Sequence, residues 1–383
     1  MKTVSIQPVL IRWARERAGL AVDDLSGRFP RYRLWESGQA SPTLTQLERL
    51  AQRTRTPLGY FFLSEPLEES LPVPDFRTLG SQGVRRRPSP DLIDTIHAMQ
   101  RRQDWLRDYL IEQGQEPLAF IGRSRLSDAP EAVAADLRSR LGITPSWAGD
   151  HATWEGALRD LRRRIEAIGV SAVVNGVVGN NTRRPLKPDE FRGFVLCDPV
   201  APLIFVNGAD SKSAQMFTLA HELAHLWLGR DGVFDLPDLE PADDDVERFC
   251  NRVAAEFLVP AAEFAGAWVE AAGATRAFHV VAQRFKVSPI VAARRALDLG
   301  VITRREFLAF QRDHGETETS RAASRLGGGD FYANQDYRVG QRFGEAVVQA
   351  VHQGRLLYTE AYQLTGLYGE TFERFAKGIS ARL

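Results

Sequence analysis

The stretch that decides the fold runs from Phe217 to Gly229 and reads Phe-Thr-Leu-Ala-His-Glu-Leu-Ala-His-Leu-Trp-Leu-Gly. Its apolar residues are typical of a buried helix, and Gly229 is a suitable residue to end that helix. On a helix, His221 and His225 lie one turn apart on the same face, where both imidazoles can bind one zinc ion. Glu222 points to the adjacent side and can take a proton from a zinc-bound water. The stretch therefore predicts a zinc site on a buried helix.

The alternative interpretation of this helix is an ordinary core element with two satisfied histidines. A helix that buries two histidines and a glutamate in an apolar frame is costly unless those groups are paired or bound to a metal. That cost favours the metal site. A structural zinc site uses four protein ligands, whereas a catalytic one keeps a position open for water.

A second stretch offers a third protein ligand. The residues from Asp245 to Val259 read as a helix that Pro260 ends. Glu247 and Asn251 share one face of that helix, so Glu247 can bind zinc while Asn251 hydrogen-bonds a liganding histidine. Glu256 points to roughly the opposite side and is the weaker candidate. The alternative for Glu247 is a solvated carboxylate beside the preceding acidic run.

Together the two stretches resemble the metallopeptidase family that includes ImmA and IrrE. The resemblance rests on Phe217–His225 and on the pattern Glu-x-x-x-Asn-x-x-Ala-Ala-Glu-x-Leu-x-Pro at 247–260. It implies a zinc ion held by three ligands, His221, His225 and Glu247. It also implies that Glu222 is the general base of a gluzincin-like endopeptidase. The usual target is a transcriptional repressor or other regulatory protein, in the control of transcription or of a stress or mobile-element response.

The amino-terminal region resembles the Cro/repressor type of helix-turn-helix domain. The resemblance rests on Leu34–Leu44, which reads Leu-Trp-Glu-Ser-Gly-Gln-Ala-Ser-Pro-Thr-Leu, and on the Leu-x-x-Leu-Ala helix after it. Residues 1–60 contain ten Lys/Arg and five Asp/Glu, a net +5 within a chain whose net charge is zero. This local charge is compatible with contacts to DNA phosphates.

One departure from that pattern concerns the recognition helix. Few residues separate Ser26 from Arg33, and Pro30 stands among them, so the turn and the recognition helix are expected to be short. Arg31, Arg33 and Gln39 remain the candidates for DNA contact. The alternative is a small helical domain that binds a protein or packs on the enzyme.

Composition limits the class of protein. With 383 residues, 44% of them hydrophobic and 26% charged, the chain is expected to form two or more globular domains. The 49 basic and 49 acidic residues indicate no polyelectrolyte partner for the chain as a whole. Two cysteines make no disulfide framework, and we see no signal peptide and no membrane span. We therefore expect a cytoplasmic protein without membrane contact.

The predicted fold class is α+β and mostly helical. We expect a helix-turn-helix domain at 1–65, a linker with helices at 66–150, a zinc metallopeptidase domain at 151–270 and a helical region at 271–383. Strand-like runs at 170–178, 191–197 and 203–206 predict a small sheet packed on a zincin-like helix. Either of the last two runs could bind a peptide substrate as an added strand.

Three functions fit these features. The leading hypothesis is a zinc-dependent endopeptidase with a protein substrate. The second is a DNA-binding transcriptional regulator or antitoxin whose zinc site is structural or vestigial. The third, a zinc hydrolase for small molecules, gives no reason for the amino-terminal domain. Metal analysis and a cleavage assay on partner proteins separate the first two.

The DNA-binding hypothesis has a direct test. DNA from the chain's own promoter is expected to be retarded in a gel-shift at low salt, and less so when the salt is raised, because phosphate contacts release counterions. Absence of retardation at low salt would remove this function from residues 1–65.

Overall fold

The computed structural model describes residues 2–69, 88–234, 244–271, 276–322 and 331–381. They fall into two compact units. The first contains the described residues up to 97, and the second contains those from 98 onward. The boundary lies within one helix, α5 (Pro90–Glu112). The chain is mostly helical with a small mixed sheet, as the predicted α+β class requires.

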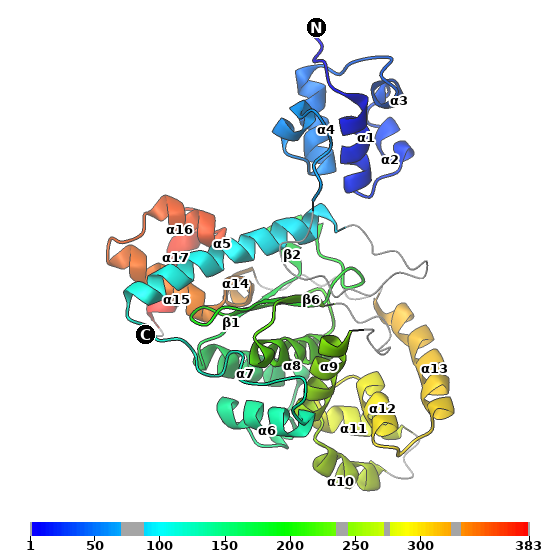
Figure 1. Ribbon diagram of the computed structural model, residues 1–383, viewed down its shortest axis with the longest axis vertical. Coiled ribbons are helices and arrows are strands. Elements are labelled where there is room, and N and C mark those ends of the chain that lie inside the picture. Colours follow the sequence, from blue (N-terminus) through cyan, green and yellow to red (C-terminus); the bar gives the residue numbers. More distant parts are fainter. Residues whose placement is uncertain (1, 70–87, 235–243, 272–275, 323–330, 382–383) are drawn as a thin grey trace. The chain divides into compact units, whose positions relative to one another are not determined.

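Short helices form the first unit (Figure 1). These are α1 (Pro8–Arg17), α2 (Val22–Ser26), α3 (Tyr32–Glu36), α4 (Leu44–Thr54) and the 3-10 helix η1 (Leu58–Phe62). Trp13, Trp35 and Leu47 are buried in their common core. Thr43 begins α4 with a reciprocal cap, because its hydroxyl accepts from Gln46 N while the Gln46 side chain accepts from Thr43 N.

The shortening expected around Pro30 is present. Helices α2 and α3 have five residues each, and α3 uses two of its residues, Tyr32 and Trp35, for the core. Arg33 is exposed and forms an ion pair with Asp23 at 2.6 Å. Arg31 and Gln39 are also exposed. Helix α3 therefore presents few polar side chains for reading a major groove.

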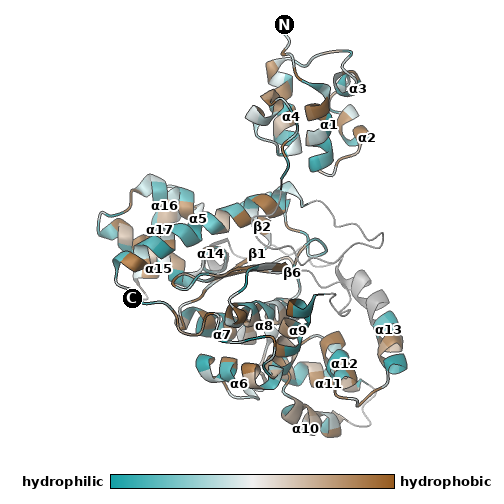
Figure 2. Ribbon diagram, in the orientation of Figure 1, coloured by the Kyte–Doolittle hydropathy of each residue, from teal (hydrophilic) through white to brown (hydrophobic). Residues whose placement is uncertain are grey.

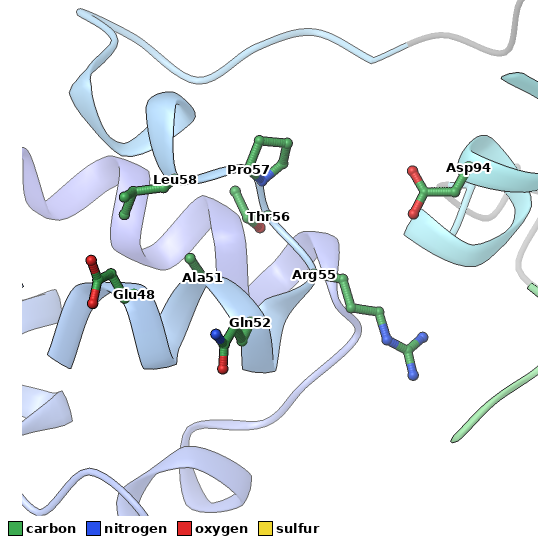
Figure 3. A pocket seen from close by; sticks show the side chains of 8 residues that line it. All are labelled: Glu48, Ala51, Gln52, Arg55, Thr56, Pro57, Leu58 and Asp94. Carbon is green, nitrogen blue, oxygen red and sulfur yellow. The ribbon is translucent and has the colours of Figure 1, made fainter. Parts of the chain in front are cut away.

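A pocket of about 370 Å³ lies in this unit at the end of α4 (Figure 3). It is lined by Glu48, Ala51, Gln52, Arg55, Thr56, Pro57, Leu58 and Asp94. None of the candidate zinc ligands lines it, so this pocket is not the predicted metal site.

The second unit is built around a four-stranded sheet in the order β1-β5-β4-β6. Its strands are β1 (Ser171–Asn175), β4 (Gly193–Leu196), β5 (Leu203–Asn207) and β6 (Gly232–Phe234). β1 and β5 are parallel, and the other pairs are antiparallel. The predicted strand regions at 191–197 and 203–206 are confirmed as β4 and β5, and the region at 170–178 contains two strands, β1 and β2 (Val177–Val178). β6 and the pairing of β2 with β3 (Asn181–Pro185) were not foreseen.

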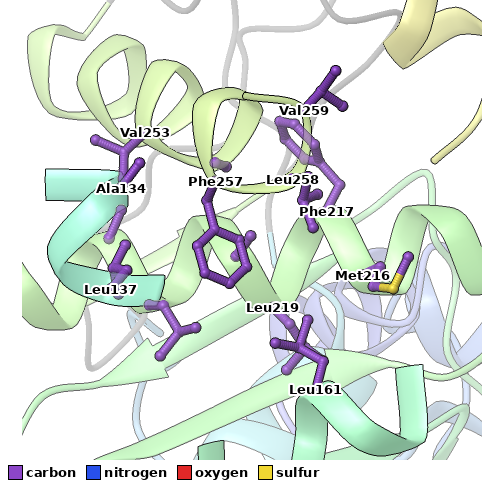
Figure 4. Packing of buried hydrophobic residues seen from close by; sticks show 14 of the residues in the cluster. Ala134, Leu137, Leu161, Met216, Phe217, Leu219, Val253, Phe257, Leu258 and Val259 are labelled. Atoms are coloured by element: carbon purple, nitrogen blue, oxygen red, sulfur yellow. The ribbon is translucent and has the colours of Figure 1, made fainter. Parts of the chain in front are cut away.

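Helices cover one face of this sheet in a layer that contains α7 (Trp154–Ala167), α8 (Lys212–Leu228) and α9 (Asp245–Leu258), with α6 (Pro130–Leu141) beyond them (Figure 1). Figure 4 shows their shared core, in which Leu137, Leu161, Leu219 and Phe257 are fully or nearly fully buried. Burying each such side chain stabilises the fold by about 2 kcal/mol. Figure 2 shows that the strands are hydrophobic as well, as expected for a sheet that is buried on both faces.

Further helices complete the unit. They are η2 (Trp147–Asp150), α10 (Ala261–Ala271), α11 (Ala277–Phe285), α12 (Pro289–Asp298), α13 (Arg304–Ala322), α14 (Phe331–Val339), α15 (Gln341–His352), α16 (Tyr358–Thr365) and α17 (Glu370–Ser380). No helix among the described residues is long and apolar enough to cross a membrane.

Two buried charges attach the carboxy-terminal helices. Arg102 of α5 donates to the carbonyls of Arg338, Leu364 and Thr365 at 2.9, 2.8 and 3.1 Å. These carbonyls lie at the ends of α14 and α16, where a cation is favourable. Glu166 of α7 accepts from Gln341 N at 2.8 Å and so caps α15, while Arg162 pairs with it at 3.1 Å.

The Glu166 contact predicts a pH dependence. Burial raises the pKa of Glu166 from 4.5 to about 7 and outweighs the attraction of Arg162. Arg342 and Glu345 also face this carboxyl. The folded chain therefore binds this proton more tightly than the unfolded chain does. Its contribution to stability is complete below pH 4.5 and declines as the pH rises through about 7, by about 3 kcal/mol in all.

Urea unfolding at about pH 5 and about pH 8 measures this contribution. Glu166→Gln should remove that part of the pH dependence, whereas Glu155→Gln, at an exposed position on the same helix, should keep it. An unchanged pH dependence in Glu166→Gln would contradict the assignment.

Candidate metal centre

Helix α8 is buried along most of its length. Ser211 begins it, as its hydroxyl accepts from Ala214 N at 3.3 Å, and Gly229 ends it in the left-handed conformation with φ 67°. Every residue from Gln215 to Trp227 is buried. The polar groups of the helix must therefore find partners inside the protein or on a bound ion.

Helix α9 packs against α8 and carries the third potential ligand. Asp244 caps it by accepting from Val246 N at 2.7 Å. The Glu247 carboxylate then lies 3.1 Å from His221 Nε2 and 3.0 Å from His225 Nε2. The two Nε2 atoms are themselves 3.1 Å apart. Three potential ligand atoms thus converge on one point.

These separations fit a zinc ion. Ligand atoms about 2.1 Å from a tetrahedral zinc lie about 3.4 Å from each other, close to the distances observed here. Two imidazoles and one carboxylate are also a ligand set that zinc accepts in hydrolytic enzymes. Among the described residues, this is the one cluster of three or more such groups, and it has no fourth member. Three ligands from the described residues would leave one position of a four-coordinate zinc for water.

The protonation states suit metal binding. Burial lowers the pKa of His221, although Glu247 and Asn251 favour its charged form. Burial would raise the pKa of Glu247, but the two histidines outweigh it and bring this pKa to about 2. A neutral imidazole and an ionised carboxylate are the forms that bind zinc.

Asn251 orients one of the histidines. Its Oδ1 lies 3.0 Å from His221 Nδ1. If Nδ1 carries the proton, it donates to Asn251 and leaves Nε2 free for the metal. The structure thus places Asn251 next to the histidine, as the shared face of Glu247 and Asn251 on α9 predicted.

Glu222 lies beside the three ligands without any hydrogen bond of its own among the described residues. Both of its carboxylate oxygens are buried and lack a partner there. Burial, with help from the Glu247 charge, raises the pKa of Glu222 well above 4.5. An orphaned buried carboxylate is expensive, and a water on a bound metal ion would satisfy it.

The structure also decides between the other candidates. Glu247 is 3% exposed, which is inconsistent with the solvated alternative. Glu256 instead forms an ion pair with Arg295 and accepts a hydrogen bond from the backbone N–H of Ala261.

One neighbour of Glu222 was missed at the sequence level. Gly193 of β4 lies so close to α8 that a Cβ atom there would be 3.2 Å from Glu222 Oε1. The available signal was a glycine within a strand-like run, which often marks a close approach of another backbone.

Metal analysis is expected to give about one zinc ion per chain, and alanine at His221, His225 or Glu247 should abolish binding. Asn251→Ala should weaken zinc affinity by about 10- to 100-fold, because His221 loses its orienting partner. Arg252→Ala, at an exposed position next to Asn251, serves as the control and should keep wild-type affinity. Equal affinities of the Asn251 and Arg252 variants would contradict the role of Asn251.

Comparison with known families adds to this picture. Residues 339–378 match a domain of unknown function, DUF8813. No curated protein matches the chain. Residues 179–297 match the model of the IrrE N-terminal-like domain, peptidase family M78. That match begins at the β2–β3 hairpin and ends in α12, so it includes both helices of the metal centre. The segment with the candidate metal centre is therefore similar to the ImmA/IrrE family, which supports a metallopeptidase-type function.

Proposed function

We propose that the chain is a zinc-dependent endopeptidase that cleaves a repressor or another regulatory protein. The observation that carries this proposal is the convergence of His221, His225 and Glu247 beside an unpartnered carboxylate, that of Glu222. Two helices hold these four groups in a buried site, where charges interact more strongly than in water.

Each residue then has a distinct role. His221, His225 and Glu247 hold the metal. A zinc ion held there would lower the pKa of a bound water and would polarise the carbonyl of the scissile peptide bond. Glu222 accepts a proton from the attacking water and delivers it to the leaving amine. Asn251 keeps His221 in the orientation that the metal requires.

The strand that receives the substrate differs from the sequence-based expectation. Neither of the two expected strands is free, because β5 pairs with β1 and β4, and β4 pairs with β5 and β6. Within the described part of the chain, β6 is bonded on one side only. In the sheet register Phe234 of β6 lies opposite Gly193, the residue next to Glu222. We therefore propose that an extended peptide adds to the free edge of β6. β6 is itself the neighbour of β4, the strand that passes next to Glu222.

The rival hypotheses are less well supported. The hypothesis of a structural zinc site requires four protein ligands, whereas the described residues supply three. DNA binding by residues 1–65 remains a separate proposal. It has support from the exposed Arg31, Arg33 and Gln39, and the brevity of α3 weakens it.

Glu222→Gln tests the mechanism. This variant is expected to bind zinc as the wild type does but to lose cleavage by at least about 100-fold, because an amide cannot accept the proton. The assay is co-expression with the proteins encoded beside this chain, followed by a search for one that is shortened by the wild type alone. Lys212→Ala, at an exposed position on the same helix, is the control and should cleave normally. Undiminished cleavage by Glu222→Gln would rule out this role.

A further inference from the structure

Gly193 occupies a position where the structure has no room for a side chain. A Cβ atom there would lie 2.4 Å from Thr218 Cγ2, 2.8 Å from the Phe205 carbonyl oxygen and 3.2 Å from Glu222 Oε1. Gly193 is not among the residues with positive φ, so the backbone conformation does not demand glycine. The constraint at this position is therefore space.

Two of these three close atoms belong to one turn of α8, and the third is a backbone oxygen of the neighbouring strand β5. Thr218 and Glu222 are four residues apart and share the helix face that meets β4. Two residues along the same strand, Val195 is fully buried and packs into the core shared with α8. Side chains alternate between the faces of a strand, so Val195 and Gly193 share this face. The strand accepts a valine at one of these positions and has no room for a methyl at the other.

Packing is also what holds the Glu222 carboxylate in place. His221 has Asn251 as a hydrogen-bond partner, whereas neither carboxylate oxygen of Glu222 has one within the described structure. A buried group without hydrogen bonds is oriented by the atoms that it touches. The backbone of β4 at Gly193 lies next to Glu222, since a Cβ atom built there would be 3.2 Å from Oε1.

We propose that Gly193 is a positioning residue for Glu222, which it allows to lie beneath β4 at the side of the metal ligands. This inference rests on the proposed function. A methyl group at 193 should push the Glu222 carboxylate away from the strand and change its distance from the metal-bound water. The three ligands should be unaffected, since His221 and His225 face α9.

Cobalt substitution provides a readout that does not require the substrate. The protein is loaded with Co²⁺, and its visible absorption is titrated with pH in the wild type, Gly193→Ala, Glu222→Gln and the double variant. Gly193→Ala should bind one Co²⁺ with an affinity within about threefold of the wild type. The midpoint pH of the absorption change should shift by about one pH unit in the same direction as in Glu222→Gln. The reason is that a carboxylate close to the metal changes the pKa of the metal-bound water. On the Glu222→Gln background, Gly193→Ala should add no further shift.

Two further variants guard against a general packing effect. Gly266→Ala introduces a methyl where no heavy atom lies within 4 Å and should behave as the wild type. If Gly193→Ala does not fold, the double variant Gly193→Ala with Thr218→Ser removes the nearest contact, at 2.4 Å, and keeps those with the Phe205 carbonyl oxygen and Glu222 Oε1. The same criteria apply to it.

The outcomes are distinguishable. A wild-type midpoint in Gly193→Ala, or an equal shift with and without the Glu222 carboxylate, overturns the positioning role and leaves the metal centre intact. A wild type that binds no Co²⁺, or a Glu222→Gln midpoint that is unchanged, overturns the proposed function and the positioning role with it.

Discussion

At the centre of the second unit, a buried carboxylate on α9 meets two buried imidazoles on α8. The Glu247 oxygens lie 3.0 and 3.1 Å from the two histidine nitrogens, and all three side chains are at most 3% exposed. Removing such charges from water costs several kcal/mol per ion unless the geometry is excellent. The surrounding apolar core of α6, α7, α8 and α9 provides the stability that offsets this cost. A bound divalent cation would make this otherwise destabilising cluster of buried polar groups a source of stability.

The sheet and the carboxy-terminal helices place this cluster. Gln103 of α5 donates to the carbonyls of Leu196 and Ala201 at 2.8 and 3.0 Å, which fixes the end of β4 and the loop before β5. Helices α14 and α15 pack against β1 and cover that edge of the sheet. Among the described strands, the opposite edge of the sheet is β6. Glu222 itself is fully buried.

Much of the site was readable from spacing alone. His221 and His225 at i and i+4, and Glu247 and Asn251 at i and i+4, each define one helix face, and helical geometry is local. Pro30 likewise predicted the short α3. The close approach of Gly193 to α8 and the hydrogen-bond partners of Glu166 and Arg102 could not be predicted from the sequence. Each of these contacts depends on a segment far away in the chain. Strand order was not readable either, since apolar runs such as those of β4 and β5 do not reveal which strand lies at an edge.

The sequence by itself determined the periodicity of α8 and α9, and with it which side chains share a face. That is a property of 3.6 residues per turn and needs no partner. Only the tertiary structure decided that these two faces meet, that Glu247 and not Glu256 is the acid at the histidines, and that β4 passes next to Glu222. The physical reason is that each of these contacts brings together residues that are distant in the chain. Such contacts are selected by the packing of the whole core.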